Sequence, residues 1–202
     1  LGLCDGISMD VVFPNRTGED DPAGPNLWEF APDRIATLTG ATLPECTPET
    51  GTGRGLRLVK EIYEAEGSDE QSVPVLYDKA SGRIVNNESA EILRMLDRQA
   101  GPLGSTLPGA DRSRLYPDDA ELRAEIDALN DLVYVTVNNG AYKAGFSSDQ
   151  AVYVAAFDAY FDTLQQLEAR LSDGRRFLTG DRFTEADLRL FPTLYRHDSV
   201  YY

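Results

Sequence analysis

The chain has 202 residues, of which 42% are hydrophobic and 9% aromatic, so it can bury a core as one large or two small domains. Asp and Glu number 34 against 19 Lys and Arg, and the formal net charge is −15. A field of this sign repels nucleic acid and anionic lipid, so we expect neither as a partner. Without a long apolar run or a secretory leader, we expect no membrane contact and a cytoplasmic location.

Cysteine and histidine are scarce. Cys4 and Cys46 are far apart in the sequence, and His197 is the single histidine. These residues suit neither a conventional metal site nor a disulfide framework, and one histidine leaves little room for a Ser-His-Asp site. We therefore expect a reduced protein that binds no metal.

The first half of the chain predicts a mixed domain. Residues 7–13 alternate as a half-buried strand does, and residues 14–52 read as a long loop around Trp28. A short helix before residue 70 is indicated by apolar residues on one helical face, namely Leu56, Val59, Ile62 and Tyr63. Two β-rich runs, residues 72–78 and 82–86, flank a turn at residues 80–82 and predict a hairpin. A further helix begins near Glu88 and Ser89, with Ile92, Leu93 and Leu96 facing inward.

Glycine and proline dominate residues 98–115, which we take as a linker. Beyond it the pattern is helical throughout. The apolar face of the first predicted helix carries Leu122, Ile126, Leu129, Val133 and Val137. A second helix is predicted over residues 151–171, and its inward-facing residues are Val152, Ala156, Tyr160, Leu164, Leu167 and Leu171. A third helix starts at Thr184, where Asp187 completes a capping box.

This order of elements predicts an α+β domain, residues 1–97, followed by an all-helical domain, residues 116–202. A hairpin between two helices forms the second half of a thioredoxin-like domain. A helical domain after it is the layout of the glutathione transferase fold, with its thioredoxin-like N-terminal and all-helical C-terminal domains. Layout by itself is an analogy and does not decide a function.

Three stretches make the resemblance more specific: VPVLYDKASGRIVNNESAEILRML (73–96), DLVYVTVNNGAYKAGF (131–146) and FLTGDRFTEADLRLFPTLYRHDSVY (177–201). Together, in this order, they resemble the glutathionyl-hydroquinone reductases, the Xi class of glutathione transferases. The resemblance covers nearly the whole chain apart from residues 14–55 and 98–115. It implies that an N-terminal cysteine motif segment and C-terminal helices are missing from a chain that begins at Leu1.

The same resemblance implies a site for a thiol. The Val73-Pro74 bond would be cis and would turn the Val73 backbone toward the cysteinyl part of glutathione, as an added strand does. Glu88 and Ser89 would receive the ammonium and carboxylate of the γ-glutamyl part at a helix start. The alternatives are a plain edge-strand proline and ordinary helix capping.

Two aromatic residues complete the implied site. Trp28, in the segment Trp28-Glu29-Phe30, matches a family Trp-x-Phe segment that borders the thiol, although a loop-packing tryptophan is the alternative. Tyr142 matches a family tyrosine over the substrate site, where a phenol can bond a hydroquinone oxygen and help protonate the leaving carbon. A packed helix tyrosine is the competing interpretation. The family's VPVLW reads VPVLY here, with Tyr77 in place of tryptophan.

The implied reaction is the thiol-dependent reduction of glutathionyl-hydroquinones through an enzyme–cysteine mixed disulfide. The co-substrate would be glutathione or a related γ-glutamyl thiol, the substrates quinone thioethers, and the assembly a homodimer. The nucleophile lies in a CPWAHR-like motif that these residues do not contain, and neither Cys4 nor Cys46 has the sequence surroundings of one. Alternatives are a non-catalytic transferase-like binding module and an ordinary glutathione-conjugating transferase.

The acidic, lysine-poor composition is consistent with adaptation to high salt and equally with an acidic bacterial protein from a genome rich in G and C. The salt hypothesis predicts a melting temperature that falls at low ionic strength, because carboxylate repulsion is then unscreened. Melting curves from low to molar salt test it, and an unchanged melting temperature would contradict it.

Overall fold

The computed structural model describes residues 1–35, 46–108 and 114–198. The chain divides into two compact units. The first contains Leu1–Leu96 and Pro102–Leu107, and the second contains Asp97–Gly101 and Pro108–Tyr202. The predicted linker, residues 98–115, is shared between the two units, and its residues 109–113 lie outside the described residues.

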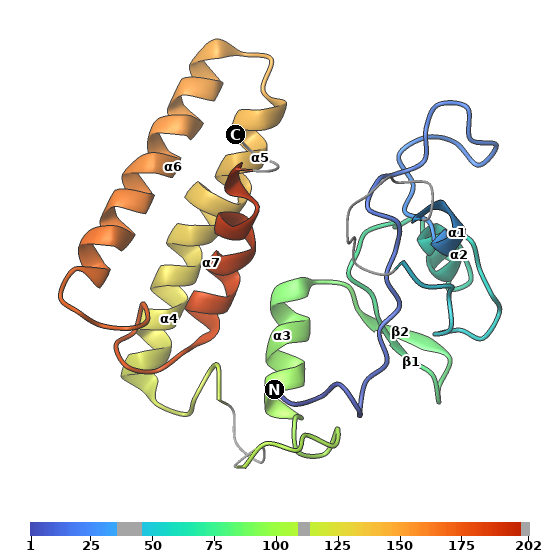
Figure 1. The fold of residues 1–202 in the computed structure, drawn as a ribbon, viewed down its shortest axis with the longest axis horizontal. Coiled ribbons are helices and arrows are strands. Elements are labelled where there is room, and N and C mark those ends of the chain that lie inside the picture. Colours follow the sequence, from blue (N-terminus) through green and yellow to red (C-terminus); the bar gives the residue numbers. More distant parts are fainter. Residues whose placement is uncertain (36–45, 109–113, 199–202) are drawn as a thin grey trace. The chain divides into compact units, whose positions relative to one another are not determined.

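The first unit holds a small hairpin between helices, as predicted (Figure 1). Its described elements are α1 (Pro32–Ile35), α2 (Val59–Glu64), β1 (Leu76–Asp78), β2 (Arg83–Asn86) and α3 (Ser89–Arg98). Strands β1 and β2 pair antiparallel, and Tyr77 lies opposite Ile84. Helix α2 buries Val59, Ile62 and Tyr63, three of the four residues predicted for its inner face. In α3, Ile92, Leu93 and Leu96 are half-buried.

The predicted strand at residues 7–13 is wrong, because the structure forms no strand there. Residues 7–13 are held by isolated hydrogen bonds to other segments and not by a continuous ladder. Val11 accepts the Thr47 N–H, but its own N–H donates to the Thr47 hydroxyl, at 2.8 Å, where a ladder would offer a backbone carbonyl. Phe13 N–H donates to the Glu29 carbonyl at 2.8 Å. Met9 is 78% exposed, so the expected alternation of buried and exposed residues also fails.

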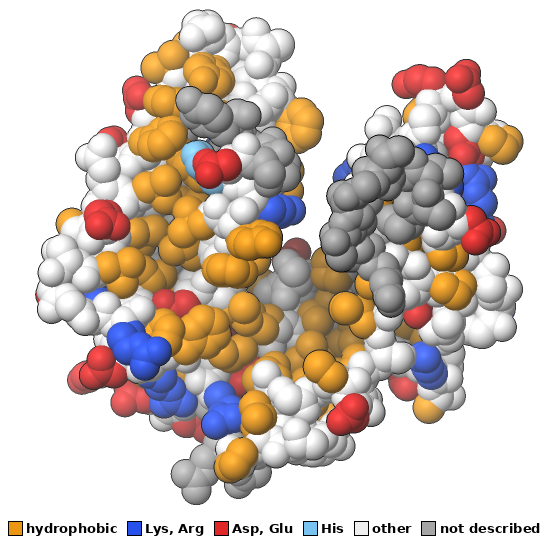
Figure 2. All heavy atoms as spheres, viewed as in Figure 1, with side chains coloured by type: hydrophobic (Ala, Val, Ile, Leu, Met, Phe, Trp, Pro, Cys, Tyr) orange, Lys and Arg blue, Asp and Glu red, His pale blue; other side chains and the backbone are white. Residues whose placement is uncertain are grey.

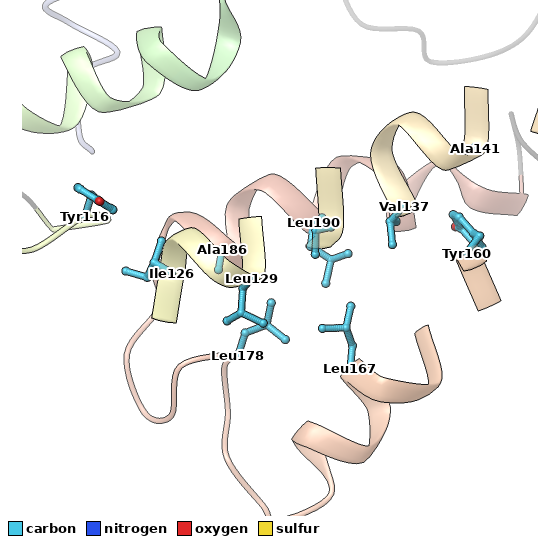
Figure 3. Close-up of a cluster of buried hydrophobic side chains, with 11 residues drawn as sticks. Tyr116, Ile126, Leu129, Val137, Ala141, Tyr160, Leu167, Leu178, Ala186 and Leu190 are labelled. Carbon is cyan, nitrogen blue, oxygen red and sulfur yellow. The ribbon is translucent and has the colours of Figure 1, made fainter. Parts of the chain in front are cut away.

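The second unit is helical throughout its described part. It consists of α4 (Ala120–Val133), the π-helical turn η1 (Tyr134–Asn138), α5 (Asn139–Phe146), α6 (Gln150–Leu171) and α7 (Glu185–Tyr195). Its core gathers side chains from these helices and from the segments before α4 and α7, as Figure 3 shows for ten labelled residues. The predicted inward residues Ile126, Leu129, Val133 and Val137 all lie in this core. The predicted capping box of α7 forms, and Asp187 accepts the Thr184 N–H at 2.9 Å.

Polar bonds inside the helical unit hold the π-helical turn. The Asn138 amide donates to the Arg189 carbonyl at 3.0 Å and to the Thr193 hydroxyl at 3.1 Å. The Thr163 hydroxyl donates to the Thr136 hydroxyl at 2.8 Å. These bonds tie η1 to α6 and α7, and η1 leads directly into α5, the helix of Tyr142.

One prediction about α6 needs correction. Val152 was expected to face inward, but it is 49% exposed, and the first turns of α6 lie at the surface. The buried part of α6 begins later, where Tyr160, Thr163 and Leu167 meet the core. Figure 2 shows apolar side chains gathered over the helices of this unit, and exposed residues on α6 include Tyr153, Val154 and Phe157.

Asp97, at the end of α3, organises the start of the helical unit. Its side chain is almost fully buried, and its two carboxylate oxygens accept the N–H groups of three successive residues, Arg114, Leu115 and Tyr116, at 2.9–3.1 Å. A buried carboxylate is stable only when such donors replace the water it has lost. Asp97 therefore fixes the backbone that leads into α4.

Candidate functional site

The predicted Val73-Pro74 bond is cis, as expected from the resemblance. The strand begins at Leu76, four residues after the start of the predicted run at residue 72, so Val73 and Pro74 lie before it. Among the described residues, the backbone N–H and C=O of Val73 have no hydrogen-bond partner. The Val73 residue is half-buried and Pro74 is exposed. A backbone N–H and C=O without partners in the protein can pair with the backbone of a peptide ligand.

Ser72, directly before Val73, has every polar group in use. Its N–H donates to the Glu70 carboxylate at 3.0 Å, and its carbonyl accepts the Tyr63 hydroxyl at 3.0 Å. Its hydroxyl accepts the Asn87 amide, also at 3.0 Å. Hydrogen bonds from the backbone N–H groups of Gln71 and Ser72 lower the pKa of the Glu70 carboxyl, so this acceptor stays ionised at neutral pH. Ser72 is thus anchored on three sides.

Glu88 and Ser89 lie at the exposed N-terminal start of α3. The amides of the first helical turn have no acceptor within the helix, and the helix dipole adds positive potential there. The Glu88 carboxylate accepts the Ala90 N–H at 3.4 Å, so it weakly caps the helix, in line with the alternative interpretation. The Ser89 hydroxyl makes no hydrogen bond within the described part of the chain. A carboxylate ligand could therefore accept from Ser89 without displacing an existing bond.

The two asparagines before α3 set the position of Glu88. Asn86 accepts the Glu88 N–H at 2.6 Å and donates to Glu91 at 2.6 Å. Asn87 donates to Ser72, as described above. This last bond joins the residue before Val73 to the residue before Glu88.

Trp28 is hydrogen-bonded to α2, the helix that also bonds Ser72. Its carbonyl accepts the N–H of Val59, the first residue of α2, at 3.0 Å. Tyr63, one helical turn further along α2, is the donor to Ser72. The Trp28 ring is half-buried, and the Arg16 guanidinium lies 4.8 Å from its centroid, within the range of a cation–π contact. Helix α2 therefore contacts both the tryptophan segment and the Val73 segment.

Tyr142 belongs to the helical unit. Its side chain is 45% exposed on α5, and its ring stacks on Phe146 with centroids 6.1 Å apart. A phenol is a side chain that can both donate and accept a hydrogen bond. Whether it faces the Val73 segment stays a prediction.

Sequence reasoning missed four contributors: Arg16, Glu70, Ser72 and Asn87. The pattern NNES did contain a signal for Asn87, because two asparagines before a helix are typical of side-chain bonds to nearby backbone. Ser72 and Glu70 gave no comparable signal. Within the described ranges, no cluster of His, Cys, Asp and Glu could hold a metal ion, and no helix is long and apolar enough to cross a membrane.

The chain is similar in sequence to known proteins. Residues 120–202 match the family model "Glutathione S-transferase, C-terminal domain". The chain is 50% identical over 182 residues to glutathionyl-hydroquinone reductase PcpF of Sphingobium chlorophenolicum, covering 89% of the chain and 52% of PcpF. It is 46% identical over 203 residues to glutathionyl-hydroquinone reductase YqjG of Escherichia coli, covering 99% of the chain and 54% of YqjG.

Solved structures match as well. The glutathione-bound structure of YqjG has a TM-score of 0.75, with 37% identity in that alignment, and 95% of this chain and 55% of the other are covered. Glutathione transferase Xi 1 of Trametes versicolor also gives a TM-score of 0.75, with 38% identity and coverage of 95% and 60%. The chain is therefore similar to Xi-class glutathione transferases over almost all of its length. It has the glutathione transferase fold, and it spans about half the length of the curated relatives it matches.

The two cysteines of the chain differ in their surroundings. Cys4 is exposed, whereas Cys46 is only 8% exposed, and its sulfur accepts the Ala31 N–H at 3.3 Å. Neither lies at the N-terminus of a helix in the described part of the chain. Both are therefore poor candidates for the nucleophile.

This contrast predicts the pattern of thiol labelling. In the folded protein, the Cys4 thiol should react rapidly with a maleimide. The Cys46 thiol should react at a rate roughly a tenth of that or lower, because it becomes accessible only by local opening. Mass spectrometry of the labelled protein measures both rates. Cys4→Ser should abolish the fast reaction and Cys46→Ser should leave it unchanged; rapid labelling of Cys46 would contradict its burial.

Proposed function

We propose that the protein to which this chain belongs reduces glutathionyl-hydroquinones to hydroquinones, with glutathione or a related γ-glutamyl thiol as co-substrate. The observation that carries the proposal is the unpaired Val73 backbone beside the open start of α3. Support comes from 46–50% identity to two proteins named glutathionyl-hydroquinone reductases.

The free groups suit the two ends of a γ-glutamyl thiol. The Val73 N–H and C=O would pair with the backbone of the cysteinyl residue, as one strand pairs with another. The α-carboxylate of the γ-glutamyl residue would accept from Ser89 and from the amides of α3, and its ammonium would donate to Glu88. Trp28 would border the thiol. These residues would contact only the γ-glutamyl and cysteinyl parts of the thiol, so other thiols that contain both parts would also bind.

The reaction transfers two electrons from thiols to an aryl carbon. A cysteine thiolate attacks the glutathionyl sulfur, a disulfide bond forms, and the carbon–sulfur bond breaks with its electron pair on the carbon. Protonation of that carbon releases the hydroquinone. A glutathione thiolate then displaces the cysteine, and glutathione disulfide leaves. We propose that this cysteine is neither Cys4 nor Cys46 but one outside these 202 residues.

Tyr142 is our candidate for the group that contacts the hydroquinone. An exposed phenol can donate a hydrogen bond to the hydroquinone oxygen and assist protonation of the leaving carbon. The π-helical turn η1, tied to α7 through Asn138, sets the start of the helix that carries it. Such turns occur often at functional sites.

For the organisation of the protein, we propose a thioredoxin-like domain over residues 1–97, a linker over residues 98–115 and a helical domain over residues 116–202. We also propose a homodimer in the cytoplasm, where thiols stay reduced. The apolar residues exposed on the helical unit, such as Phe157, Phe191 and Tyr195, support an interaction surface there.

Substitutions at the start of α3 test the thiol site. Glu88→Gln and Ser89→Ala should each weaken glutathione binding about tenfold, because each removes one hydrogen bond to a charged ligand group. Isothermal titration calorimetry measures the dissociation constants. Glu121→Gln is the matched control, since Glu121 is an exposed acid in the first turn of α4. Equal effects of all three substitutions would contradict the assignment.

Product analysis tests the reaction itself. The full-length protein, supplied with a glutathionyl-hydroquinone and glutathione, should release free hydroquinone and glutathione disulfide in equal amounts. Conjugation would instead consume glutathione without forming disulfide and would favour the ordinary transferase. Glutathione binding with no product of either kind would favour a binding module.

A further inference from the structure

We infer that Ser72 is a positioning residue of the thiol site, which joins its cysteinyl-binding half to its γ-glutamyl-binding half. The inference rests on the proposed function. The bond that carries it runs from the Asn87 amide to the Ser72 hydroxyl at 3.0 Å, between residues 15 apart in the sequence.

The other bonds of Ser72 show what this hydroxyl adds. The Ser72 N–H and C=O are held by Glu70 and Tyr63, so the segment before Val73 is anchored to α2 by backbone groups. These anchors do not involve α3. Of the hydrogen bonds that Ser72 makes, only the bond between its hydroxyl and Asn87 reaches the loop before α3. The Ser72 hydroxyl also lies 3.5 Å from the Tyr63 hydroxyl, and a serine-to-alanine change removes that contact too. Because the bonds of the Ser72 backbone remain, the change leaves Val73 anchored and releases the connection to the loop before Glu88.

The connection matters for a ligand that spans both halves. The γ-glutamyl and cysteinyl parts of glutathione are covalently joined, so its two sets of partners must be held at a fixed separation. A pre-set separation lowers the entropic cost of binding such a ligand. A ligand that contacts only Val73 gains nothing from it. Ser72 thus acts as a specificity-determining residue through Asn87, without contacting the ligand.

The experiment compares two ligands on the same protein. Glutathione contacts both halves, whereas cysteinylglycine lacks the γ-glutamyl residue. Dissociation constants for both come from calorimetry, with cysteinylglycine measured by competition against glutathione. The variants are Ser72→Ala, Ser72→Thr, which keeps a hydroxyl, and Asn87→Ala, which removes the donor. Ser105→Ala is the control, because the Ser105 hydroxyl, in the same unit, also accepts an N–H, that of Leu107 at 3.2 Å.

We expect Ser72→Ala and Asn87→Ala to weaken glutathione about tenfold and cysteinylglycine less than twofold. Ser72→Thr and Ser105→Ala should stay within twofold of the unsubstituted chain for both ligands. Such ligand selectivity is not expected from general destabilisation, which circular dichroism melts monitor in parallel. Equal weakening of the two ligands, or no weakening of either, would overturn the role of Ser72 while leaving the thiol site intact. An unsubstituted chain that binds no glutathione would overturn both the role and the proposed function.

Discussion

The contrast between two adjacent residues defines this protein's candidate site. Every polar group of Ser72 is bonded within the protein, and the backbone of Val73 has no partner among the described residues. Unpaired backbone groups are costly unless water or a ligand satisfies them. The anchored residue holds the free one in place, so the free groups are presented in a set position. Helix α2, through Tyr63, and the loop before α3, through Asn87, both bond to Ser72.

In the helical unit, buried polar side chains are likewise held by hydrogen bonds within the protein. Glu185 is fully buried and bonds Asn130 at 3.0 Å and Arg189 at 3.1 Å, so a charge inside the core has its partners on two helices. Asn138 bonds α7 in the same way. Such networks specify one arrangement of helices, since any shift leaves a buried polar group unsatisfied. The position of Tyr142 within this unit follows from that arrangement.

The sequence predicted the elements with regular periodicity and the residues that match family motifs. Helices α2, α3, α4, α6 and α7, the hairpin and the cis bond before Pro74 were all predicted. The strand at residues 7–13 was wrong because the Thr47 side chain replaces a backbone partner, which no periodicity reveals. Val152 was predicted to be buried because periodicity shows which face of a helix is apolar. It does not show how far the other helices extend along that face. Ser72 was missed because its role depends on Asn87, which folding brings beside it.

The most direct test of the central claim is a titration of the ¹⁵N-labelled chain with glutathione, followed by amide chemical shifts. The account predicts a saturable shift of the Val73 amide as it gains a hydrogen-bond acceptor, together with shifts of Glu88 and Ser89. All three should fit one dissociation constant. Saturable binding that leaves the Val73 amide unmoved would contradict the account, because the free backbone would then not be the ligand's partner.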